Sequence, residues 1–134
     1  MGYKAVLIKR NSYFNHLHVF PCFGVLPGQE RTASVSYDGI SSFGRRGILH
    51  HVRDSVSSLI PTQVRLGSGK SIDYEYLAIA TGAWQPPLAK ALSTEKAEAC
   101  VELQASQKRI QHANRITVVG GGPVGIQIAT DTAS

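Results

Sequence analysis

The chain has 134 residues, of which 43% are hydrophobic and 17% charged, and its formal net charge is +5 at pH 7. This composition is typical of a globular protein rather than a disordered one, and the length allows one domain at most. The basic residues are scattered in pairs at most, such as Lys9-Arg10 and Arg45-Arg46. They do not form the cationic patch of a nucleic-acid interface. We expect no nucleic-acid partner; the positive charge instead favours phosphate-bearing ligands.

The two cysteines, Cys22 and Cys100, are far apart in the sequence and form no C-x-x-C motif. This spacing argues against a disulfide framework and against a redox-active dithiol, and it suits a reducing compartment. No apolar stretch is long enough to span a membrane, and no secretion signal is visible. We therefore expect a protein of the cytoplasm or the mitochondrion, not a secreted one and without a membrane span. Peripheral membrane contact stays open.

The first predicted element is a strand. The short apolar run Ala5–Ile8 is followed at once by Lys9 and Arg10. Such a run predicts an interior parallel strand that reaches its carboxyl end, where the ligands of open α/β sheets gather. The long stretch 11–47 contains prolines and glycines without a sustained period, so it predicts a loop with short helical turns. Its length suggests that it lines a site.

The next part of the chain predicts an antiparallel meander. Its strands are expected at 49–60 and 63–66, with a turn at 67–70 and a return strand at Ser71-Ile72. Residues 76–80 predict another buried strand, which Thr81-Gly82 end.

A polar helix is expected after the pair Pro86-Pro87, which breaks the chain. Ser93 or Thr94 can cap this helix, and polar residues dominate up to Asn114. The thin apolar stripe of the helix suits a connection between two units better than the filling of a core.

The last part of the chain has the pattern of a dinucleotide-binding turn. The apolar run Ile116–Val119 predicts a buried strand, and it leads directly into G-x-G-x-x-G at residues 120–125. In such a turn, Gly120 makes the tight bend, Gly122 lets the backbone approach a pyrophosphate, and Gly125 lets the following helix pack closely. The pyrophosphate then rests on the helix N-terminus. A glycine-rich turn can also be purely structural, but the flanking patterns favour a nucleotide site.

The order of these elements resembles the two-dinucleotide flavoproteins, the family of pyridine-nucleotide oxidoreductases in which an NAD(P)H domain interrupts an FAD domain. The segment Ile72–Gly82 looks like the second FAD signature of this family, and Val118–Gly125 looks like its NAD(P)H signature. The likeness covers essentially the whole chain. It implies the α/β fold class, as an incomplete FAD/NAD(P)-binding Rossmann-like fold with an antiparallel β-meander, and it implies FAD and NAD(P)H as cofactors.

Within this family, Asn11–His16 and Val19–Pro21 are similar to the apoptosis-inducing-factor-like and type II NADH dehydrogenase branch. The disulfide reductase branch would have a paired-cysteine motif in this stretch, where the chain has Cys22 alone. The resemblance therefore implies hydride transfer from NAD(P)H to FAD and delivery to a quinone or similar small-molecule acceptor.

The chain departs from the family pattern in three ways: one motif is missing, and two residues differ from those usual in the family. The first G-x-G-x-x-G, which holds the FAD pyrophosphate, is expected about 20 residues or more before the strand end at Ile8, and the sequence does not contain it. Lys9 stands where the family usually has an acidic residue that accepts hydrogen bonds from the adenosine ribose, and a lysine can only donate. Gln127 stands where the NAD(P)H signature commonly continues with Glu. We therefore interpret the chain as a fragment that is inactive and does not retain FAD in isolation.

The resemblance implies a partial FAD-binding domain at 1–92, a connecting helix at 93–114 and the start of an NAD(P)H-binding half-domain at 115–134. The residues expected toward FAD are Lys9, Val56, Ala80, Thr81 and Gly82. Those expected toward NAD(P)H are Gly120, Gly121, Gly122, Pro123, Val124, Gly125 and Gln127. The alternative for Thr81-Gly82 is a plain strand end, and for Val56 a core position. No catalytic side chain is named, and no metal site is expected.

Two other classes of function stay open. One is a non-catalytic truncated remnant, and the other is a nucleotide-binding module without enzyme activity that uses only the glycine turn.

Overall fold

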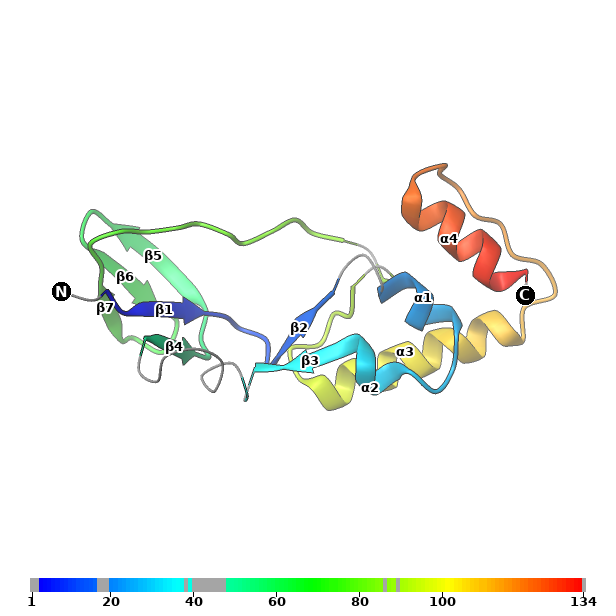
Figure 1. Cartoon of the computed structure of the whole chain (residues 1–134), viewed down its shortest axis with the longest axis horizontal. Coiled ribbons are helices and arrows are strands. Elements are labelled where there is room, and N and C mark those ends of the chain that lie inside the picture. The colour runs from blue at the N-terminus through cyan, green and yellow to red at the C-terminus, as the bar shows by residue number, and fades with distance from the viewer. Residues whose placement is uncertain are drawn as a thin grey trace. The chain divides into compact units, whose positions relative to one another are not determined.

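The apolar run near the start of the chain forms a parallel strand, as predicted. The computed structural model describes residues 3–16, 20–37, 39, 48–85, 87–88 and 90–133. Strand β1 (Ala5–Ile8) pairs in parallel with β4 (Leu49–Val52), and Ile8 lies opposite Val52. The carboxyl ends of the two strands therefore lie side by side (Figure 1). The prediction of an interior strand is wrong: within the described residues the sheet has these two strands alone, and their side chains are exposed or half-buried.

The stretch predicted as a loop with helical turns does contain two short helices. These are α1 (Phe20–Val25) and α2 (Glu30–Ala33). It also contains an antiparallel strand pair that was not predicted, β2 (Tyr13–Asn15) with β3 (Ser34–Ser36). Strands of three residues are too short to show a period of two in the sequence, and unlike the short strand predicted at Ser71-Ile72, these two are not joined by a tight turn that would mark them as a hairpin.

The predicted meander is present as β5 (Val56–Ile60), β6 (Gln63–Leu66) and β7 (Ser71–Asp73), all antiparallel. The single strand expected at 49–60 is instead divided into β4 and β5. The division occurs where the Asp54 carboxylate accepts a hydrogen bond from the Ser55 amide at 2.7 Å, since such a local bond competes with a strand ladder.

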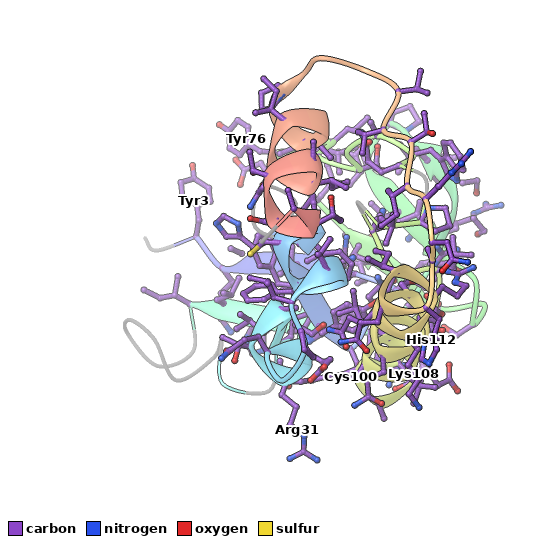
Figure 2. The ribbon with its side chains drawn as sticks, turned by 90° about the vertical axis from the view of Figure 1, so that its right-hand side faces the viewer. Tyr3, Arg31, Tyr76, Cys100, Lys108 and His112 are labelled. Carbon is purple, nitrogen blue, oxygen red and sulfur yellow. The ribbon has the colours of Figure 1, made fainter. Side chains whose placement is uncertain are left out.

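Two further strand predictions are wrong. Residues 76–80 and 116–119 form no strand, and most of their side chains are exposed: Tyr76 is 76%, Ile79 69% and Val119 93% exposed. An apolar run becomes a strand only when a neighbour completes its hydrogen-bond ladder, and neither run belongs to a sheet of the described chain. Tyr76 instead meets Tyr3 edge to face, with ring centroids 5.7 Å apart (Figure 2).

The predicted polar helix is α3 (Lys96–Gln111), and the helix after the glycine turn is α4 (Pro123–Thr132). The buried residues of α3 are Ala99, Leu103, Ser106 and Gln107, which lie on one face at helical spacing. This face packs in a core whose other members are Tyr13, Phe20, Ala33 and Ala91. None of the described helices is both long enough and apolar enough to cross a membrane.

The chain divides into two compact units. Unit 1 comprises Met1–Ser12 and Tyr37–Ala83, and unit 2 comprises Tyr13–Ser36 and Trp84–Ser134. Unit 1 therefore contains the parallel pair and the meander, and unit 2 contains the short strand pair and all four helices of the described chain.

Candidate functional site

The glycine turn has the backbone geometry that its sequence predicts. Gly120 has φ +120°, in the left-handed region that glycine adopts without strain. Gly122 is the N-cap of α4, with φ −75° and ψ 172°, and Pro123 is the first helical residue. Proline is favoured there because its fixed φ suits the helix and its missing N–H would have had no helical partner. The Ile126 amide donates to the Gly122 carbonyl at 3.0 Å and closes the first turn of the helix.

Gly125 has a role within the turn itself. A Cβ atom at this position would collide with the backbone carbonyl oxygen of Gly120 and lie 3.7 Å from the Val118 side chain. At Gly121 and Gly122, by contrast, a Cβ atom would meet nothing within 4 Å. The first helical turn therefore packs against the bend through Gly125, while the face at Gly122 is open to an approaching ligand.

The electrostatics of this turn favour an anion. The first amides of a helix have no acceptor within it, so the N–H groups of Val124 and Gly125 are available to a ligand. The helix dipole adds a partial positive charge at the same end, and the first turn of α4 carries no acidic side chain. The residues from Gly120 to Val124 are exposed. This arrangement can hold a phosphate or pyrophosphate through backbone groups.

Gln127 lies on the next turn of α4, and its side chain lies near the thiol of Cys22 on α1. Burial and the nearby Asp131 carboxylate raise the pKa of the Cys22 thiol, and the Gln127 side chain opposes them in part. Cys22 and Cys100 are both free thiols. Gln127 thus takes part in the contact between α1 and α4.

The residues predicted to face FAD all lie in unit 1, whereas the glycine turn lies in unit 2. Lys9 directly follows β1. Val56 begins β5 and is 48% exposed, so its interpretation as a core valine is wrong. An exposed segment outside any strand contains Ala80, Thr81 and Gly82, so the interpretation of Thr81-Gly82 as a strand end is also wrong. Gly82 does have a left-handed φ of +69°.

The structure places a further cation, Arg53, near Lys9 at the carboxyl ends of the parallel strands β1 and β4. Arg53 directly follows β4 as Lys9 and Arg10 follow β1, and the Arg53 Nε donates to the Arg10 carbonyl oxygen at 3.4 Å. In the sequence, Lys9 and Arg10 follow an apolar run, whereas the segment before Arg53 contains two histidines. The pairing of the two strands, which brings the cations together, is not a local property and was not predicted.

A groove in unit 2 lies apart from the predicted residues. It has a volume of about 450 Å³ along α3, and its lining includes Phe20, Leu88, Leu103 and Arg109. None of the residues predicted to bind a cofactor lines it. The described residues also include no group of three or more His, Cys, Asp or Glu side chains that could hold a metal ion.

Comparison with known proteins identifies the family. Residues 4–134 match the family model of the pyridine nucleotide-disulphide oxidoreductases. The chain belongs to this family. The prediction from the two signatures is confirmed, as is the α/β fold class with its incomplete Rossmann-like fold and antiparallel meander. Proteins of the pyridine nucleotide-disulphide oxidoreductase family bind FAD and NAD(P)H.

Several curated proteins are similar to the chain. Fe-regulated protein 8 of Mycosarcoma maydis is 28% identical over 98% of the chain and 38% of its own length. Apoptosis-inducing factor homolog A of Dictyostelium discoideum is 27% identical over 92% of the chain and 29% of its own length. The nitric oxide reductase FlRd-NAD(+) reductase of Vibrio vulnificus is 30% identical over 63% of the chain and 23% of its own length. The chain thus spans between 23% and 38% of these relatives.

Among solved structures, the sulfide:quinone oxidoreductase of Aquifex aeolicus is similar to the chain with a TM-score of 0.52. The match covers 83% of the chain and 27% of that protein at 22% sequence identity. It is a likeness of fold.

Proposed function

We propose that this chain is part of an NAD(P)H-dependent FAD oxidoreductase that passes electrons to a quinone or similar small-molecule acceptor. The observation that carries the proposal is the turn at residues 120–125, where an open glycine face and the amino end of α4 meet. Family membership supports it. We also propose the domain bounds that the family resemblance implies. They are a partial FAD-binding domain at 1–92, a connecting helix at 93–114 and the start of an NAD(P)H-binding half-domain at 115–134.

In this proposal, the backbone of the chain holds the pyrophosphate of NAD(P)H. Gly122 permits close approach, and the amides of Val124 and Gly125 donate to the phosphate oxygens. Gly120, Gly121 and Pro123 set the path of the turn. The redox chemistry belongs to the nicotinamide and the flavin, and the contribution of the protein is to bind and orient them.

The residues proposed to contact FAD suit their ligand less well than the glycine turn suits NAD(P)H. Gly82 allows a tight backbone turn, but Lys9 offers only N–H donors to the ribose hydroxyls, which in this fold usually donate to a carboxylate. This observation favours a second candidate function, a module that binds a nucleotide through the glycine turn without catalysis. Bound flavin in the purified protein would distinguish the enzyme from the module.

The acceptor and the compartment are proposed from the resemblance to the apoptosis-inducing-factor-like branch. A homologue from Dictyostelium discoideum has this name, and the similar solved structure is that of a sulfide:quinone oxidoreductase. The free thiols Cys22 and Cys100 suit a reducing compartment, and we propose the cytoplasm or the mitochondrion.

Gly122→Val tests the proposed function. A side chain there would occupy the open face and displace the pyrophosphate from the backbone. Losing one hydrogen bond to a charged oxygen costs about 1.5 to 3 kcal/mol, so we expect NADH and NADPH to bind roughly ten- to a hundredfold more weakly. Fluorescence titration of the reduced nicotinamide measures this.

The matched control is Gly39→Val. Gly39 is also exposed, and an added Cβ atom there would meet nothing within 4 Å. We expect this variant to bind both nucleotides as the parent chain does. Unchanged binding in Gly122→Val would mean that the turn is purely structural.

A further inference from the structure

The groove along α3 has an apolar lining that is fixed by packing. Phe20 and Leu103, which line it, also belong to the buried core of unit 2. Leu88 lines it too and has φ +79°, a left-handed conformation that residues other than glycine rarely adopt. Its side chain packs on Gly24 of α1, where an added Cβ atom would lie only 3.2 Å from the Leu88 Cδ2 atom. The surrounding structure thus holds Leu88 in a strained conformation, which is a feature of ligand sites.

The size of the groove suits a small molecule. Its volume of about 450 Å³ is within the range of small-molecule sites, roughly 300 to 1,000 Å³. The groove continues as a second hollow of about 300 Å³, which shares Leu88 and Arg109 with the first and reaches Ile110 near the end of α3. All of these residues belong to unit 2, so the groove lies within one unit. It therefore has room for an extended apolar chain.

The charged side chains of the groove leave one positive charge for a ligand. The lining contains two cations, Lys90 and Arg109, and one carboxylate, that of Glu102. This carboxylate is engaged by the backbone, because it accepts hydrogen bonds from the Leu92 amide at 2.7 Å and the Ser93 amide at 2.9 Å. No ion pair joins either cation to a carboxylate within the part of the chain that the structure describes.

The Arg109 side chain is held at the groove by a buried hydroxyl group. Its Nη2 donates to the Ser106 Oγ at 3.0 Å, and Ser106 is 7% exposed. A guanidinium has five N–H donors in a planar fork, so donors remain for a ligand. This fork matches the two oxygens of a carboxylate. Because the side chain is already anchored, less of its conformational freedom is lost on binding.

From these observations we propose that the groove binds a small amphipathic carboxylate. Its apolar chain would lie along Phe20, Leu88 and Leu103, and its head group would lie at Lys90 and Arg109. A monoanion balances the single positive charge of the lining, and an apolar chain covers its apolar side chains. The site is separate from the glycine turn, since none of the residues 120–125 lines either hollow.

The test is saturation-transfer NMR titration of the 134-residue chain at micromolar concentration with octanoate, 1-octanol and acetate. 1-Octanol has the chain of octanoate without its charge, and acetate has the charge without the chain. We expect octanoate to bind about tenfold or more tightly than either, because it alone combines charge-assisted hydrogen bonds with apolar contact. Equal affinity for 1-octanol, or for acetate, would overturn the proposal.

Removing a cation should affect the anion alone. We expect Lys90→Gln and Arg109→Gln each to weaken octanoate binding by about three- to tenfold and to leave 1-octanol binding unchanged, whereas Arg109→Lys should retain most of the octanoate affinity. The matched control is Lys108→Gln, which removes the same charge from an exposed residue of α3 outside the lining. Unchanged octanoate binding in either groove variant, or an equal loss in Lys108→Gln, would contradict the proposal.

Ala105→Trp tests whether the ligand lies in the groove. Ala105 is an exposed member of the lining, so an indole ring there would fill part of the groove without disturbing the core. We expect this variant to lose most of its binding of octanoate and 1-octanol. Ala97→Trp is the control, because Ala97 is exposed on α3 outside both hollows. Full octanoate affinity in Ala105→Trp would overturn the assignment to the groove.

Circular dichroism verifies that each variant keeps the secondary structure of the parent, and the charge variants keep the test decisive if Ala105→Trp does not fold. The glycine turn also favours anions, so Gly122→Val separates the two sites. We expect Gly122→Val to bind octanoate as the parent chain does. If it weakens octanoate binding as much as Arg109→Gln does, the carboxylate binds at the glycine turn and this inference fails, while the proposed function stands.

Discussion

At the residue scale, Gly125 shows that a glycine can be needed for packing rather than for ligand approach. An added methyl group would collide with the Gly120 carbonyl oxygen. We expect Gly125→Ala to loosen the start of α4 by about 1 to 3 kcal/mol, the usual cost of overpacking. Hydrogen–deuterium exchange of α4 measures the change. Gly121→Ala is the control, because its methyl group would meet nothing within 4 Å; equal exchange in the two variants would count against the collision.

Tyr13 is buried in the core of unit 2, and its hydroxyl donates to the Ser93 carbonyl oxygen at 2.8 Å. Burial, with a smaller effect from the Glu102 charge, raises the pKa of Tyr13 from 10.0 to about 12. A group with a raised folded pKa stabilises the fold fully below its unfolded pKa and loses that effect as the pH rises through the folded one. We expect this contribution to fade between pH 10 and about 12.

Tyrosinate absorbance, taken as the difference between the parent chain and Tyr13→Phe, measures this titration directly. The variant also removes the hydrogen bond to Ser93 and leaves that carbonyl without this donor, which costs about 1 kcal/mol. A difference spectrum with a midpoint near pH 10, the ordinary value for tyrosine, would show that the Tyr13 hydroxyl is not buried in solution.

At the scale of elements, the packing of α1 against α4 can be tested through Cys22. Asp131 raises the pKa of this thiol and Gln127 lowers it. Because the thiolate is the reactive form, Asp131→Asn should speed alkylation of Cys22 at pH 8, and Gln127→Ala should slow it. Iodoacetamide labelling in a Cys100→Ser background provides the rates. Identical rates in the three chains would indicate that α1 and α4 do not pack in this way.

The elements that could be predicted from the sequence are those with a local cause. β1 follows from a continuous apolar run, the meander from its turn residues, and α4 from the glycine turn before it. The runs 76–80 and 116–119 were predicted as strands on the same apolar signal, but a strand also needs a neighbour, and that neighbour cannot be found from the run itself. Two short strands, β2 and β3, were missed because three residues show no period and no hairpin turn joins them, as one joins β6 to β7.

The same distinction holds for the candidate site. The bend at Gly120 and the presence of a helix after the glycine turn depend on local properties of the chain, so the sequence predicts them. The position of Arg53 beside Arg10 depends on the register of β1 with β4. The sequence of neither strand alone determines which residues of the other strand it pairs with. The roles of the individual residues in cofactor binding remain predictions.

At the scale of the whole molecule, the two sets of predicted cofactor residues belong to different units. Each unit also presents apolar side chains to solvent, including Ile79 in unit 1 and Val119 in unit 2. Exposed apolar segments without a partner promote association. We therefore expect the isolated chain to associate as its concentration rises and to unfold without a sharp cooperative transition.

Val119→Lys tests the contribution of the 116–119 run. Val119 is 93% exposed, so a charge there should cost little in folding and should reduce association. Val101→Lys is the control, because Val101 is 63% exposed on α3 in the same unit. Sedimentation velocity at several concentrations compares the three chains. A monodisperse parent chain, or equal association in the two variants, would contradict the expectation.

The way the two units share the chain has a consequence for its synthesis. Unit 2 takes residues 13–36 from between the two parts of unit 1, and its core joins Tyr13, Phe20 and Ala33 to Ala99 and Leu103. On the ribosome, the first three of these side chains emerge long before α3 exists to cover them. Because transiently exposed apolar surface favours misassembly, the nascent chain would depend on chaperones throughout the translation of the meander.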